Sequence, residues 1–106
     1  MRSVPLLSAL VLTLSVAGAL APVPAKANPI ERACLESSRA AGDRELCSCV
    51  GEAANRTLTA RQMREGARFF TDPQRAQEVR DSTSRRHEDM WRAWNDFGQT
   101  AEDMCG

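Results

Sequence analysis

The chain has 106 residues, of which 14 are Lys or Arg and 14 are Asp or Glu, so its formal net charge is zero. The charges are unevenly placed, because residues 28–106 hold 12 Arg against 14 acidic residues and are net negative. Nonspecific binding of nucleic acid requires a clear positive excess, which this part of the chain lacks. The length is that of one small domain, which excludes a multidomain enzyme or a complete transporter.

Residues 1–27 are typical of a secretory signal peptide. A basic start is followed by an apolar run, and Ala25 and Ala27 supply the small side chains that signal peptidase requires before its cut. We expect cleavage between Ala27 and Asn28, which leaves a disulfide-bonded helical domain of residues 28–106. A permanent membrane anchor is the alternative, but polar residues dilute the short run. We expect the mature chain to leave the membrane and to reach the periplasm or the cell exterior.

An even number of cysteines in a short exported chain predicts two disulfides. The four are Cys34, Cys47, Cys49 and Cys105. Cys47 and Cys49 point about 200° apart in a helix, so each is expected to bond a distant partner. Cys34 with Cys47 and Cys49 with Cys105, or Cys34 with Cys49 and Cys47 with Cys105, are both open, with a slight preference for the first. A redox or metal-handling role of Cys47 and Cys49 is the functional alternative.

Helix-capping residues recur along the expected mature chain and are followed by apolar positions at helical spacing. The expected helix starts are Asn28, Asp43, a Thr59–Gln62 capping box, Asp72 before Pro73, and Ser84 after a short loop. Leu46 and Val50 are expected on the apolar face of the second helix. No segment alternates with a period of two. The sequence predicts an all-α fold of four or five short helices in a small disulfide-stapled bundle.

Two aromatic residues and a row of arginines are the candidate surface contacts. Core packing is the favoured interpretation for Trp91, but if this surface binds a partner, Phe69 and Trp91 are the first candidates, because both lie off the centre of their helices' apolar faces. Arg61, Arg64 and Arg68 share one face of the third helix. This face could hold an anionic partner or be a solvated surface that Glu65 interrupts.

No catalytic or cofactor site is recognisable in the sequence. His87 is the only histidine, so no His pair can hold a metal, and the Gly-rich phosphate loop and the nucleophile elbow are both absent. Glu88 or Asp89 could combine with His87 and a Ser in a Ser–His–acid site, but such residues are frequent enough to occur together by chance. We therefore expect no enzyme activity, no metal and no cofactor.

Several segments together carry a resemblance to a known group. They are Leu46-Cys47-Ser48-Cys49-Val50, Phe69-Phe70-Thr71-Asp72-Pro73 and the Trp-rich final helix up to Cys105. The chain resembles small exported alphaproteobacterial proteins with four cysteines and uncharacterised function, some of which are labelled "arginine transporter". The resemblance implies no catalytic or ligand residues.

A chain of this length cannot form a membrane pathway, so the label would imply at most an accessory protein of arginine transport. Recognition of a guanidinium group needs carboxylates over an aromatic face. The local cluster with that composition is Glu88, Asp89 and Asp96 beside Trp91 and Trp94.

The leading hypothesis from the sequence is a binding module in the cell envelope. Its partner is expected to be another envelope protein, with no binding of nucleic acid and no membrane contact after signal removal. The sequence leaves the ligand and the oligomeric state open.

Overall fold

The computed structural model describes residues 26–37 and 43–106. This part of the chain contains helices α1 (Pro29–Glu36), α2 (Arg44–Thr57), α3 (Ala60–Thr71), α4 (Pro73–Asp81) and α5 (Arg85–Cys105), and no strand. The predicted all-α bundle with two disulfides is confirmed. Residues 1–25 of the predicted signal peptide lie outside the described residues. Within the described ranges, no helix combines the length and the apolar character that a membrane crossing requires.

Most of the helix starts follow from local capping chemistry. In four helices the side chain of the N-cap residue accepts a hydrogen bond from a backbone N–H of the first turn. These N-cap residues are Asn28, Asp43, Thr59 and Ser84. The fourth helix, α4, begins with Pro73 after Asp72, whose side chain makes no capping bond. The predicted starts of all five helices are confirmed.

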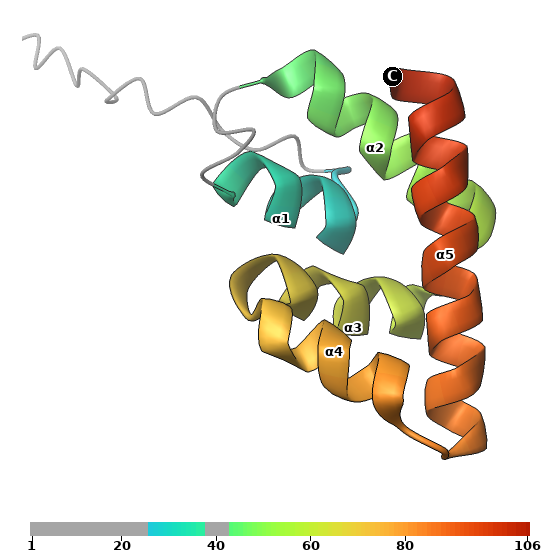
Figure 1. Cartoon of the computed structure of the whole chain (residues 1–106). Coiled ribbons are helices and arrows are strands. Elements are labelled where there is room, and N and C mark those ends of the chain that lie inside the picture. The colour runs from blue at the N-terminus through green and yellow to red at the C-terminus, as the bar shows by residue number, and fades with distance from the viewer. Residues whose placement is uncertain (1–25, 38–42) are drawn as a thin grey trace, which may run out of the picture.

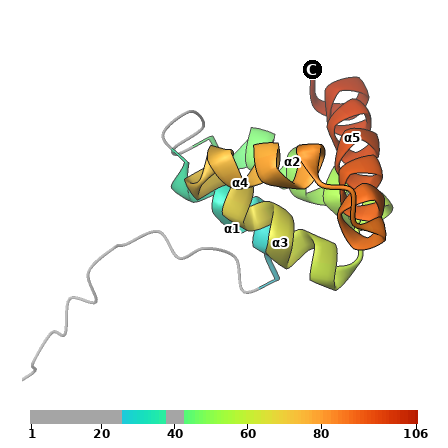
Figure 2. The same ribbon diagram turned by 60° about the horizontal axis from the view of Figure 1, so that its bottom comes forward.

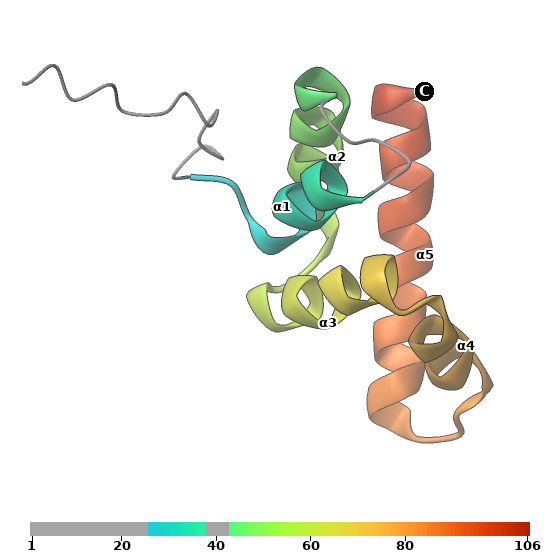
Figure 3. The same ribbon diagram turned by 90° about the vertical axis from the view of Figure 1, so that its left-hand side faces the viewer.

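The long helix α5 is the support on which two helical hairpins pack (Figure 1). The pair α3 and α4 contacts its N-terminal part, and α2, which carries α1, contacts its C-terminal part. The side view in Figure 3 shows the two pairs one above the other along α5. In addition α1 contacts α3, so the two hairpins also touch each other.

The apolar interior consists of two clusters that share one ring. The larger contains Ile30, Ala53, Ala54, Leu58, Met63 and Phe97. The smaller contains Phe69, Val79 and Met90 and lies between α3, α4 and α5. Trp94 packs against both. Its ring centroid lies 5.0 Å from that of Phe69 and 4.9 Å from that of Phe97.

Two expectations about side-chain exposure are wrong. Leu46 was expected on the buried face of α2 but is 37% exposed. The reason is that α1 packs on the side of Cys47 and Gly51, which turns the buried face of α2 away from Leu46. Phe69 was expected near the surface but is only 5% exposed, because α4 and α5 cover its side of α3.

Candidate functional site

Both disulfides start from α2 and leave it in different directions. Cys47 is bonded to Cys34 of α1, with a Cα–Cα distance of 5.5 Å, and Cys49 is bonded to Cys105 of α5 at 5.8 Å. All four cysteines of the chain are therefore bonded. The sequence leaves two disulfide pairings open, and the structure contains the one that the sequence slightly favours. The bridges fix α2 to the helices on either side of it.

The redox alternative requires both bridges to open, because Cys47 and Cys49 have different partners. Cys47 has no exposed surface and Cys34 is 4% exposed, whereas Cys49 and Cys105 are half-buried. An attacking thiolate needs access to a sulfur atom. The accessible bridge is thus the one between Cys49 and Cys105, which is not a Cys-x-Cys pair. Across residues 26–37 and 43–106, no group of three potential ligand side chains could hold a metal ion.

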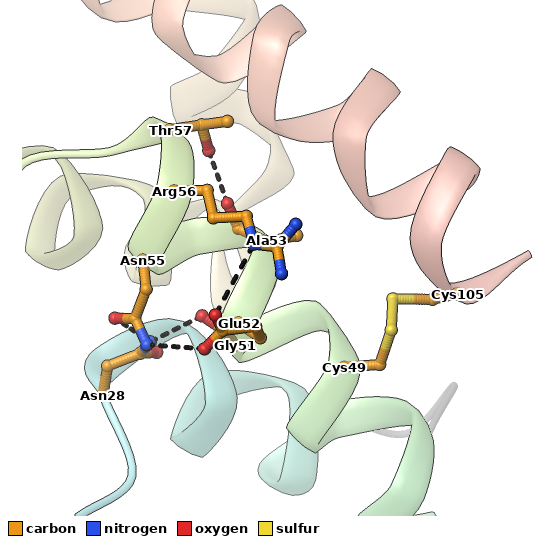
Figure 4. A network of polar contacts seen from close by, with 9 residues as sticks. All are labelled: Asn28, Cys49, Gly51, Glu52, Ala53, Asn55, Arg56, Thr57 and Cys105. Carbon is orange, nitrogen blue, oxygen red and sulfur yellow. Dashed lines mark hydrogen bonds and ion pairs between the residues drawn. A yellow bond between two sulfur atoms is a disulfide. The ribbon is translucent and has the colours of Figure 1, made fainter.

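The residue after the predicted cleavage point ties α1 to α2. Asn28 Oδ1 accepts a hydrogen bond from the Glu31 N–H at 2.9 Å. Asn28 Nδ2 donates to the Gly51 carbonyl oxygen at 2.8 Å and to Asn55 Oδ1 at 3.0 Å (Figure 4). The preceding residue, Ala27, is buried. A single amide side chain therefore caps one helix and joins it to the next.

Replacing Asn28 with Ala should lower the free energy of unfolding by about 2 kcal/mol. The variant loses a helix cap, worth about 1 kcal/mol, and a partly buried hydrogen bond to Gly51, worth about 1 kcal/mol. Urea unfolding followed by circular dichroism measures the change. Asn55→Ala is the matched control, because it removes only exposed hydrogen bonds. Equal losses in the two variants would contradict this role of Asn28.

An open cleft lies between the first turns of α3 and α5. Its volume is about 560 Å³, and its lining residues are Thr59, Arg61, Gln62, Glu65, Arg85, Arg86, Asp89 and Met90. Figure 2 shows α3 and α4 beside the N-terminal part of α5. Met90 is buried, Gln62 and Glu65 are half-buried, and the other lining residues are exposed. The cleft is therefore polar and charged at its solvent side.

The charged side chains of the cleft have no ion-pair partner within the described part of the chain. The ion pairs found there join Arg56 to Glu52 and Arg80 to Asp81. The cleft contains three guanidinium groups and two carboxylates, and none of these five takes part in either pair. All five remain available to a ligand.

This cleft was not predicted from the sequence, which shows basic residues at the starts of two helices but not that they line one space. Arg61 is the second residue of α3, and Arg85 and Arg86 are the first two residues of α5. The N-terminal end of a helix carries positive partial charge, so a cation in the first turn costs about 0.3–1 kcal/mol. The basic residues in the first turns of α3 and α5 are thus a departure from local preference, which Arg44 at the start of α2 shares outside the cleft.

The two predicted aromatic contacts differ in how deeply the structure buries them. Phe69 belongs to the smaller core cluster and is not a surface contact. Trp91 is half-buried and packs against the same cluster. The predicted arginine row is exposed, and of its members Arg61 lines the cleft whereas Arg64 and Arg68 do not.

Two of the residues considered for guanidinium recognition, Trp94 and Asp89, lie in different surroundings. The Trp94 ring lies among phenylalanine rings, with the Phe70 ring centroid at 6.2 Å in addition to those of Phe69 and Phe97. Glu88 and Asp96 are exposed and line no part of the cleft. Asp89 lies in the cleft with the arginines. Asp89 therefore faces the cleft, whereas the indole of Trp94 packs in the apolar interior.

His87 belongs to the cap of α5. Its Nδ1 lies 2.7 Å from Ser82 Oγ, and its backbone N–H donates to Ser84 Oγ at 3.2 Å. Ser82 Oγ also accepts a hydrogen bond from the Ser84 N–H at 3.2 Å. In the described residues no carboxylate is hydrogen-bonded to His87. These contacts close the turn between α4 and α5.

Comparisons with models of protein families, with curated proteins and with solved structures found no match to this chain. Its function is therefore inferred from the residues and their geometry.

Proposed function

We propose that the chain is an exported binding module of the cell envelope that acts by binding another protein. The observation that carries the proposal is the cleft between α3 and α5. Its three arginines and two carboxylates have no ion-pair partner in the described part of the chain. Charged groups that a small domain leaves unpaired around a concavity are suited to pairing with groups of a partner.

Export is part of the proposal and is supported by the cysteines. All four are bonded, and stable disulfides belong to oxidising compartments such as the periplasm. A domain of this size has a small core, so the two bridges also supply stability that its apolar clusters lack. The likeness to exported four-cysteine proteins, taken from the sequence, points in the same direction.

Capture from envelope extracts tests the proposal. The tagged chain, produced by export and checked for both disulfides, is incubated with the extract, cross-linked and recovered. We expect one protein to be enriched in repeated experiments. The matched control is the same chain reduced and alkylated, which keeps the composition and charge but loses the bridges. Recovery of nothing above background, or equal recovery by both forms, would show the proposal to be wrong.

A further inference from the structure

The cleft arginines come from two helices and face a common space. Arg61 belongs to the first turn of α3, and Arg85 and Arg86 belong to the first turn of α5. All three are exposed and have no ion pair within the described residues. Because the two helix starts also contribute positive partial charge, an anionic group in the cleft would reduce the repulsion among these like charges.

A carboxylate is a good match for this arrangement. The guanidinium group has a planar set of donors that fits the two oxygens of a carboxylate, and it is less strongly hydrated than an ammonium group. The expected mature chain has 12 Arg and no Lys, so this donor type is the one it offers throughout. Several guanidinium groups spread over two helices would engage several carboxylates rather than one.

The two acidic residues of the cleft favour a polypeptide over a compact anion. Glu65 and Asp89 line the same space as the arginines and have no ion pair in the described part of the chain. An inorganic phosphate would face both carboxylates without compensation. A polypeptide has backbone N–H groups and basic side chains that can be directed toward Glu65 and Asp89 while its acidic side chains meet the arginines.

We propose that the cleft binds an acidic segment of the partner protein, with carboxylates of that segment paired to Arg61, Arg85 and Arg86. The inference rests on the proposed function and adds the chemistry of the partner. Binding of such a segment would explain why arginines occupy the starts of α3 and α5, where they do not stabilise their own helices.

A defined probe tests the inference on the purified full chain. The probe is a blocked, fluorescent peptide of alternating Glu and Ala, and its neutral control has Gln in place of Glu. Anisotropy should show binding of the acidic probe alone, and the binding should weaken as salt is added. The triple variant Arg61→Gln, Arg85→Gln and Arg86→Gln should bind the acidic probe at least about tenfold more weakly than the wild type does.

The matched control carries the same change in net charge at other places. Arg32, Arg44 and Arg75 are exposed, have no ion pair in the described residues and do not line the cleft. Their triple change to Gln should leave the affinity within about twofold of the wild type. Circular dichroism checks that both triple variants keep their helices. An equal loss of affinity for the acidic probe in the two variants would mean that net charge alone causes the effect, and this would overturn the inference.

Three further outcomes would also overturn it. The first is equal binding of the Gln probe. The second is displacement of the acidic probe by an equal concentration of inorganic phosphate, which would indicate a compact anion. The third is concentration-dependent self-association in sedimentation that the cleft variant abolishes, which would make a second copy of the chain the occupant.

The assay needs no captured protein, so it can fail while the proposed function stands. Capture of a partner by the triple cleft variant at the wild-type level would likewise overturn the acidic-segment inference and leave the proposed function intact. Loss of capture by the cleft variant, with capture retained by the control triple variant, would support both.

Discussion

Replacing Cys105 with Ser is expected to lower the melting temperature of the domain by about 15 °C or more. The bridge from Cys105 to Cys49 spans 56 residues of sequence, whereas the bridge between Cys34 and Cys47 spans 13. In the chain-entropy description the longer loop contributes about 4 kcal/mol and the shorter about 3 kcal/mol. The longer bridge also holds the last turn of α5 against α2, where an open helix end would fray.

Thermal melts followed by circular dichroism measure this effect. Arg75→Ala serves as the reference for an exposed side chain, because Arg75 is exposed and has no ion pair in the described part; it should change stability by less than about 0.5 kcal/mol. The double variant Cys49→Ser with Cys105→Ser shows whether a free thiol contributes, and it should melt close to the single variant. A melting temperature for Cys105→Ser within a few degrees of the wild type, about 4 °C or less, would mean that this bridge is not a structural staple.

Replacing Gly66 with Ala is expected to destabilise the domain by about 1–3 kcal/mol, because the site is already filled. A Cβ at this position would collide with Trp94 Cζ3 and would lie 3.0 Å from its Cε3. The indole cannot easily move away, since Phe69 and Phe97 flank it. The gain of about 1 kcal/mol that Ala normally brings to a helix interior does not offset this clash.

Gly98 provides the control with the opposite sign. It lies inside α5 with nothing within 4 Å of an added Cβ, so Gly98→Ala should stabilise the domain by up to about 1 kcal/mol. The two variants contain the same substitution in the same type of element, and urea unfolding compares them directly. Stabilisation by both would show that the Trp94 ring is free to yield and that the α3–α5 contact is loose.

The starts of the helices were predictable because capping is local. Asn28, Asp43 and Thr59 each accept a hydrogen bond from an N–H only three residues ahead, so the residue types alone reveal the cap. The same holds for Ser84 before α5. Helix α5 continues through Gly98 to Cys105, because Ala101 and Met104 still pack on the core.

The exposure of Phe69 and Leu46, and the cleft itself, could not be read from the sequence. Each depends on which helix covers which side of another, and the helical period of a single segment does not contain that information. Phe69 is buried because α4 and α5 cover its side of α3. The cleft exists only because residues near the starts of α3 and α5, separated in sequence by the whole of α4, line one space.

The position of Trp94 has a consequence for how the domain loses its structure. Its indole packs against the larger cluster, to which α1, α2, α3 and α5 contribute, and also against the cluster between α3, α4 and α5. Detaching α3 and α4 would expose this ring to water and would also remove Met63 from the larger cluster. The two halves are therefore coupled into one cooperative unit, and a sub-state with one hairpin detached and the other intact is energetically unfavourable.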